Sequence, residues 1–165
     1  MIAVLLADGF EEIEALAPVD LLRRAGHDVK TVGMNGRIII GAHGISVVAD
    51  ILPEEVDTSA LELVVFPGGM PGATNLDASK YTDEFIDAVN RCGGRLAAIC
   101  AAPLVLGRRG LLSGKRATCF PGFEGELRGA TVVNESVVTD GSITTANGMR
   151  AALEFGDELV RLLAK

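Results

Sequence analysis

The sequence predicts an α/β protein in which a mostly parallel sheet is covered by helices on both faces, giving three layers. Two observations favour this class: short, continuously apolar runs typical of strands buried on both faces, and helical patterns that alternate with them. The composition agrees, because the 165 residues are 48% hydrophobic and 22% charged, with 20 glycines. Such a chain fits most simply a single domain over residues 1–165, long enough to bury a three-layer core.

The first part of the chain sets up the alternation of strand and helix. Gly26 is expected to end the first helix, and the glycine-containing segment 41–44 separates two short strands that read as a hairpin outside the main sheet. In order, we expect a strand over 2–6, a helix over 10–24, a strand over 28–32, hairpin strands over 37–40 and 45–48, and a buried strand over 63–66.

The second part continues the same pattern and ends in a helix. A turn at Asp140-Gly141 is expected to join the last two strands. The elements predicted are a helix over 83–91, a strand over 95–99, a helix through Arg108, a strand over 117–120, paired strands within 137–145, and a helix over 148–163. Helical spacing in the last of these predicts a buried stripe formed by Met149, Leu153, Gly156, Val160 and Leu163.

Charge and hydropathy argue against several classes of partner. The net charge of −7 is unfavourable for nucleic acid or an anionic membrane, which need clustered Lys and Arg. No segment approaches the roughly 20 apolar residues that span a bilayer. The N-terminus has no basic region and reaches Asp8 too early for a signal peptide. We therefore expect a cytoplasmic protein without a nucleic-acid or membrane partner.

The residues available for metals and cofactors are few. In the cytoplasm the three cysteines, Cys92, Cys100 and Cys119, are expected to be thiols. Two histidines and no Cys-x-x-Cys or His-x-x-x-His motif offer little for a metal site. No P-loop or dinucleotide fingerprint is present. Neither a metal nor a cofactor is expected.

Cys100 is the strongest candidate for a reactive residue. In LAAICAAPLVL a buried strand runs directly into Cys100, and a helix with Pro103 in its first turn follows. A side chain at such a corner lies at the carboxyl end of the sheet, where α/β proteins bind ligands, close to free N–H groups that favour a thiolate. The alternative is a buried structural cysteine. Cys92, at a helix end, and Cys119, within the predicted strand 117–120, lack this setting.

Glu14 is a carboxylate at an unexpected place in the first helix. Phe10, Ile13, Ala17, Leu21 and Ala25 form an apolar stripe at helical spacing, and Glu14 lies near its middle. A buried carboxylate is costly unless it is hydrogen bonded or protonated, so we expect Glu14 to point toward Cys100 and to share a proton with it. The alternative is a helix that tilts and leaves Glu14 at the edge of the solvent.

The segment Pro67-Gly68-Gly69-Met70-Pro71-Gly72 follows another buried strand. Glycines there let bare N–H groups approach a ligand, although such a pair is most often just a turn. Its loop and the Cys100 corner should open on the same edge of the sheet.

Three segments together, ADGFEEIEALAPVDLLRRAG, LVVFPGGMPGATNL and LAAICAAP, resemble the ThiJ/PfpI superfamily, close to the branch of the Parkinsonism-associated protein deglycase. Their order and spacing make the resemblance specific, and it covers nearly the whole chain. It implies a flavodoxin-like sandwich, a homodimer, and a nucleophile elbow at Cys100. It also implies that Cys100 is an oxidisable nucleophile, that Glu14 is its protonated partner, and that Gly68, Gly69 and Ala101 are backbone donors.

The resemblance covers further pocket residues, and at two positions this sequence differs from its relatives. Arg24 and His43 fall where relatives place basic residues near the dimer-side wall of the pocket; for His43 a surface loop histidine is the alternative. Phe120 stands where the deglycase branch has a histidine, and Ala101 where peptidase-like branches have one. No Cys-His-acid triad is therefore available, and peptidase activity is not expected.

The leading hypothesis is an enzyme acting on small aldehydes or dicarbonyls, of the glutathione-independent glyoxalase or deglycase type, with a role in carbonyl or oxidative stress. Cys100 would add to the aldehyde, Glu14 would move the proton, and N–H groups of Gly69 and Ala101 would hold the oxyanion. One alternative is a non-catalytic redox sensor or stress chaperone that works through oxidation of Cys100. Another is hydrolysis or hydration of a different small electrophile.

Overall fold

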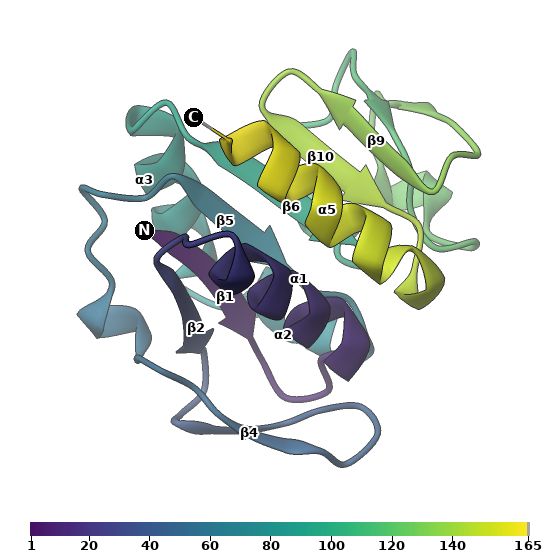
Figure 1. The fold of residues 1–165 in the computed structure, drawn as a ribbon. Coiled ribbons are helices and arrows are strands. Elements are labelled where there is room, and N and C mark those ends of the chain that lie inside the picture. The colour runs from purple at the N-terminus through teal and green to yellow at the C-terminus, as the bar shows by residue number, and fades with distance from the viewer. Residues whose placement is uncertain (165) are drawn as a thin grey trace.

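The computed structural model describes residues 1–164 and is built on a six-stranded sheet with the strand order β2-β1-β5-β6-β10-β9 (Figure 1). All neighbours are parallel except β9, which runs antiparallel to β10. The mostly parallel α/β class is confirmed. The strands are β1 Ile2–Leu6, β2 Val29–Gly33, β5 Leu63–Phe66, β6 Arg95–Ile99, β9 Val137–Asp140 and β10 Ile143–Ala146.

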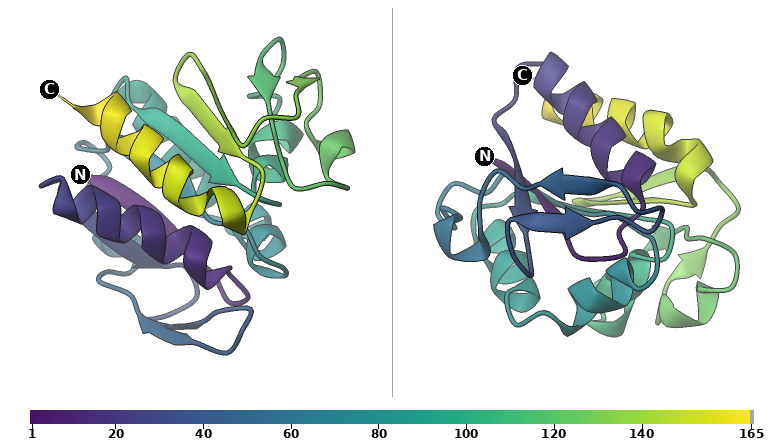
Figure 2. Two further views of the ribbon diagram at one scale, coloured as in Figure 1. Left: turned by 45° about the vertical axis from the view of Figure 1, so that its right-hand side comes forward. Right: turned by 90° about the horizontal axis from the view of Figure 1, so that it is seen from below.

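Helices cover both faces of this sheet and complete the three layers (Figure 2). On one face lie α1 (Glu12–Arg24) and α5 (Ala152–Leu163), packed on Ile2, Val4 and Leu6 of β1. The opposite face of β1 packs into a second apolar cluster beneath three other helices, α2 Gly72–Ala78, α3 Thr82–Arg91 and α4 Pro103–Arg108. Because strands β1 and β5 are buried on both faces, they are apolar throughout rather than alternating.

Smaller elements lie outside the main sheet. The predicted hairpin is confirmed as β3 (Ile38–Ile40) paired with β4 (Ser46–Val48). A two-residue strand β7 (Arg116–Ala117) pairs with β8 (Thr131–Val132). Short 3₁₀ turns occupy Pro53–Glu55, Glu124–Glu126 and Met149–Ala151.

The predicted strand over 117–120 is wrong. Only Ala117 of that run is in a strand, and Cys119 therefore lies in a connecting segment. The backbone leaves the ladder because the Thr118 N–H donates to the Thr145 hydroxyl and the Phe120 N–H donates to the Cys100 carbonyl. Helix α2 was not expected, because its N-terminal segment is rich in glycine and proline and reads as a loop.

The buried face of α1 differs from the predicted apolar stripe. Ile13 is 48% exposed, and Ala17 and Leu21 are only half-buried. The buried positions are Glu12, Glu14, Ala15, Pro18, Val19 and Leu22. The helix is thus rotated by about one residue from the expected orientation, because its contacts with both the sheet and α5 decide which face is covered.

The stripe predicted for the last helix is also largely wrong. Met149 and Leu153 are 46% and 64% exposed, Val160 and Leu163 are half-buried, and the buried residues are Ala152, Phe155, Gly156 and Leu159. Gly156 was correctly expected inside. A Cβ on it would lie 2.6 Å from the Leu21 side chain of α1, so glycine permits the close approach of α1 and α5. No helix within residues 1–164 has both the length and the apolar character needed to cross a bilayer.

Candidate active site

Cys100 forms a strained corner directly after β6. Its φ of 66° makes it the one non-glycine residue with positive φ among residues 1–164. Such a conformation costs free energy and persists only where the surroundings fix it. Here the Cys100 N–H donates to the Ala146 carbonyl over 2.9 Å, and its own carbonyl accepts from the Phe120 N–H over 2.9 Å. The geometry agrees with the predicted strand-to-helix elbow.

Glu14 lies against this corner and is almost completely buried, with 1% of its surface exposed. It belongs to the first turns of α1, and its Oε2 accepts a hydrogen bond of 3.0 Å from the Gly68 N–H. The Glu14 carboxyl is also hydrogen bonded to the Cys100 thiol. The expected burial of Glu14 is therefore present, although the stripe that suggested it is not the buried face.

The glycine pair after β5 completes the site from a third segment. The N–H groups of Ala101 and Gly69 are directed at the Cys100 sulfur, while the Gly68 N–H binds Glu14. A Cβ on Gly68 would lie 2.5 Å from the Cys100 Cβ and even closer to the Glu14 carboxylate, so only glycine fits. The strands that lead to these loops, β1, β5 and β6, are parallel neighbours, which brings their carboxyl ends to one edge.

Burial is the largest influence on the pKa values of Glu14 and Cys100 and favours the protonated form of both. Desolvation raises the pKa of Glu14 to about 7; the charge of Glu11 adds to this, while hydrogen bonds from Cys100 and Gly68 oppose it. The pKa of Cys100 is raised to about 12 by desolvation, by the charge of Glu14 and by the hydrogen bond to Glu14. Hydrogen bonds from the N–H groups of Ala101 and Gly69 lower it, but by less. The expected preference for a thiolate is therefore not found, because burial beside a carboxylate outweighs two backbone donors.

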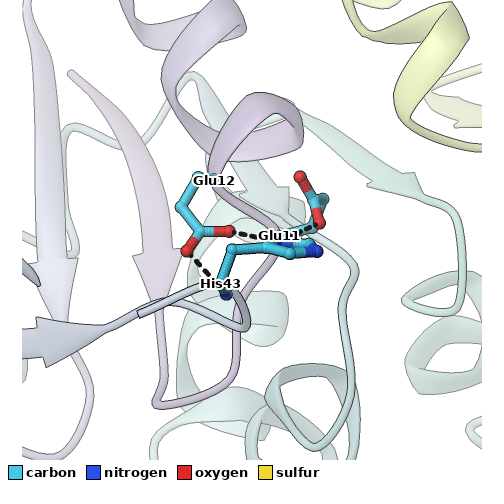
Figure 3. Close-up of side chains that lie close together, drawn as sticks. All are labelled: Glu11, Glu12 and His43. Atoms are coloured by element: carbon cyan, nitrogen blue, oxygen red, sulfur yellow. Dashed lines mark hydrogen bonds and ion pairs between the residues drawn. The ribbon is translucent and has the colours of Figure 1, made fainter. Parts of the chain in front are cut away.

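His43 bonds to a different pair of carboxylates, those of Glu11 and Glu12 at the start of α1 (Figure 3). Its Nδ1 is 3.0 Å from Glu12 Oε2 and 3.2 Å from Glu11 Oε2, and its backbone N–H donates to Glu12 Oε1 over 2.8 Å. The side-chain hydrogen bond to Glu12, followed by the charges of Glu11 and Glu12, raises the pKa of His43. Hydrogen bonds from His43 and nearby backbone lower the pKa of Glu12, overcoming its burial.

This cluster was missed from the sequence. The ligand atoms of Glu11, Glu12 and His43 lie within 4.8 Å of one another, although we expected too few residues for such a grouping. Hydrogen bonds and ion pairs from His43 to the two glutamates connect the β3–β4 loop to the start of α1. The two adjacent glutamates in GFEE were the only sign of this cluster in the sequence. No residue near them in sequence indicated that His43 would join them.

Arg24 and Phe120 have very different positions relative to Cys100. Arg24 is at the far end of α1 from Glu14, about 15 Å along the helix axis, and pairs with Asp20 over 2.7 Å. Its expected place at the dimer-side wall of the pocket stays a prediction, because that wall would need a second chain. Phe120 is adjacent to the corner through its backbone, and its half-exposed ring borders a hollow of about 450 Å³.

The other two cysteines are separate from this arrangement. Cys92, Cys100 and Cys119 are all unbridged, as expected. Cys92 is exposed, and its thiol donates to the carbonyl oxygens of Thr58 and Ser59. Cys119 is buried, and its burial together with the charge of Glu124 raises the pKa of its thiol to about 11.

Comparison with known proteins gives a family match over almost the whole chain. The model of the DJ-1/PfpI family matches residues 1–162. Protein DJ-1 homolog B of Arabidopsis thaliana is 39% identical over 161 residues, which cover 96% of this chain. They cover only 37% of that relative, so this chain spans less than half of its length.

Two further relatives carry names of activities. A deglycase of Pyrococcus abyssi is 31% identical over 165 residues, covering 98% of each chain. A protein of Caenorhabditis elegans named glutathione-independent glyoxalase is 29% identical over 93% of this chain and 82% of its own. The crystal structure of DJ-1beta from Drosophila melanogaster, 34% identical, superposes with a TM-score of 0.93 and covers 99% of this chain and 89% of its own.

Proposed function

Because this chain belongs to the DJ-1/PfpI family, we propose that it is a cysteine-dependent enzyme acting on small reactive carbonyl compounds. The observation that carries the proposal is the buried Glu14 carboxyl, hydrogen bonded to the Cys100 thiol at a strained corner. A titratable pair with strongly raised pKa values is a frequent mark of catalytic sites. The relatives named deglycase and glyoxalase support the substrate class.

The first step follows from the positions of these groups. The Cys100 sulfur attacks the aldehyde carbon, and its proton passes to the Glu14 carboxylate. A pKa of about 7 leaves a large fraction of Glu14 ionised at neutral pH, so it is well matched to act as general base. The new C–O⁻ group lies beside the sulfur, within the field of the Ala101 and Gly69 N–H groups. It takes the proton back from Glu14 to give a hemithioacetal, which leaves the Glu14 carboxylate ionised for the next step.

The remaining steps need no outside oxidant or reductant. With methylglyoxal, Glu14 removes the proton from the carbon bonded to sulfur, giving an enediol, and a proton returns to the neighbouring carbon. The product is a thioester of lactate, because one carbon is oxidised while its neighbour is reduced. Water then cleaves the thioester, releasing lactate and restoring the thiol.

We expect the protein to convert methylglyoxal to lactate without glutathione. Proton NMR of the product checks the reaction, and a panel of other dicarbonyls and glycated thiols or amines separates the glyoxalase from the deglycase type. Because the ionised Glu14 acts as base, kcat/KM should rise with pH around a midpoint near 7. Absence of turnover across the panel, or a rate that falls through this pH range, would contradict the proposal.

The second candidate is a redox sensor or stress chaperone. Cys100 is partly exposed, and Glu14 with the nearby N–H groups could hydrogen bond to a sulfinate at that sulfur. Mass spectrometry after mild peroxide treatment distinguishes the two: addition of two oxygens at Cys100 alone, with no dicarbonyl turned over, favours the sensor. For both candidates we propose the cytoplasm, where unbridged thiols stay reduced.

We further propose that the protein is a homodimer. Support comes from apolar side chains facing solvent on the β3–β4 hairpin, Ile38 at 64% and Val48 at 71% exposed, together with Ile13 on α1. Light scattering should give twice the chain mass of 17.2 kDa. Ile38→Lys with Val48→Lys should shift the protein to monomer, whereas Val132→Lys, on the short strand β8, should not. A wild-type monomer at high micromolar concentration would refute this.

A further inference from the structure

The end of strand β10 lies next to the Cys100 corner. Strands β6 and β10 are parallel neighbours in which Ile99 pairs with Ala146, so the residues after both strands emerge side by side. The Cys100 N–H bonds to the Ala146 carbonyl, and the Phe120 N–H bonds to the Cys100 carbonyl. The segment that follows Ala146 and the backbone of Phe120 therefore lie beside the backbone of the reactive residue.

A hollow of about 450 Å³ is present at this place. It is lined by Phe120, Ser136, Asn147, Gly148, Met149, Arg150 and Ala151. Phe120 and Met149, each about half-exposed, supply apolar surface, while Ser136, Asn147 and Arg150 supply polar groups. The size and the mixture of surfaces suit a small organic molecule with a short apolar part and a polar end.

Arg150 differs from most arginines of this chain in having no partner. Within residues 1–164 its guanidinium makes no hydrogen bond or ion pair, and Glu154, four residues further on, is not bonded to it. Several other arginines are ion paired, among them Arg23, Arg108, Arg109 and Arg161. An unpaired guanidinium is therefore available at this hollow, in a protein whose net charge is −7. Two of the lining residues are close to the Cys100 backbone: Phe120 bonds to it, and Asn147 follows Ala146, which also bonds to it.

We propose that Arg150 is a specificity-determining residue that binds the carboxylate of an anionic dicarbonyl while the aldehyde reacts at Cys100. The inference rests on the proposed function and narrows its substrate class. A guanidinium presents parallel N–H donors that match the two oxygens of a carboxylate. Neutral dicarbonyls would use the same thiol but gain nothing from Arg150.

A suitable probe is 4,5-dioxopentanoate, a 2-oxo aldehyde whose carboxylate is separated from the carbonyl pair by two methylene groups. Its aldehyde carbon forms the bond to sulfur, and the thiol proton ends on the resulting hydroxyl. The internal proton transfer and the addition of one water then give 2-hydroxyglutarate. Methylglyoxal is the matched neutral substrate, because it shares the dicarbonyl and lacks the carboxylate.

The test compares Arg150→Ala, in the 3₁₀ turn before α5, with Arg161→Ala, which removes the same charge from the last turns of α5. For Arg150→Ala we expect kcat/KM for 4,5-dioxopentanoate to fall by about 10- to 100-fold, mostly through KM, while that for methylglyoxal changes less than about twofold. Arg161→Ala should leave both values near wild type. An equal loss for both substrates in Arg150→Ala, or none for the anionic one, would overturn the assignment.

A binding measurement keeps this inference separate from the proposed function. Glutarate, which carries carboxylates and no reactive carbonyl, is titrated against wild type, Arg150→Ala and Arg161→Ala and followed by NMR. Weaker binding in Arg150→Ala alone supports the anion subsite even if no dicarbonyl is turned over. Glutarate that does not bind wild type, or binds all three proteins equally, overturns the subsite even if methylglyoxal is converted.

Discussion

Replacing Cys100 with serine is expected to lower kcat for methylglyoxal by about a thousandfold or more, with the fold retained. A hydroxyl is a much weaker acid than a thiol. Burial and the neighbouring Glu14 already raise the pKa of the thiol to about 12, so the same surroundings make an alkoxide still less accessible. Glu14, with its pKa of about 7, could not deprotonate serine to a useful extent.

The matched control is Cys92→Ser. Cys92 is exposed on the turn after α3, and its thiol bonds to carbonyls of a neighbouring loop, so this variant should keep wild-type turnover. Circular dichroism and the melting temperature should show both variants folded. If Cys100→Ser retained more than about a tenth of the wild-type rate, the thiol could not be the nucleophile.

Replacing Glu14 with glutamine should abolish turnover and also change how stability depends on pH. The pKa of Glu14 is about 7 in the folded protein and 4.5 when unperturbed. A raised pKa stabilises the folded state fully below pH 4.5, and this contribution is lost as pH rises through 7. The difference corresponds to about 3 kcal/mol of unfolding free energy between these limits.

Urea unfolding of wild type and Glu14→Gln at several pH values measures this loss. A neutral amide can still accept the hydrogen bond from Gly68, so the two proteins should differ little near pH 4, once both side chains are neutral. Above pH 8 the variant should be the more stable by about 3 kcal/mol. Asp20→Asn, an exposed change on the same helix, should follow wild type in activity and in pH dependence. If the unfolding free energies of wild type and Glu14→Gln changed with pH in parallel, the pKa of Glu14 could not be raised in the folded protein.

Much of the site could be predicted because its signals are local. The strand that runs into Cys100, the proline after it and the glycine pair after β5 are each contiguous in sequence. Parallel strands bring their carboxyl ends to one edge, so these loops could be placed together without coordinates. Glu14 was identified because a carboxylate among apolar residues requires a partner.

Local sequence did not predict which faces of α1 and α5 are buried, or the protonation states of Glu14 and Cys100. Ile13 and Leu153 lie on stripes with good helical spacing, yet both are exposed. An amphipathic pattern shows that a helix has a buried face, but the exact orientation depends on neighbours distant in sequence. Here the contact of α1 with Gly156 of α5 fixes it.

The sequence by itself determined the layered α/β fold and the corner at Cys100, because strand burial and turn chemistry depend on adjacent residues. It also indicated Glu14 as a buried carboxylate, although from a stripe that is not the buried face of α1. Tertiary structure decided which groups surround that corner. It paired Arg24 with Asp20, joined His43 to Glu11 and Glu12, and left Arg150 unpaired beside the hollow. It also raised the pKa values of Glu14 and Cys100, since desolvation depends on every segment packed around a group and not on the residues next to it.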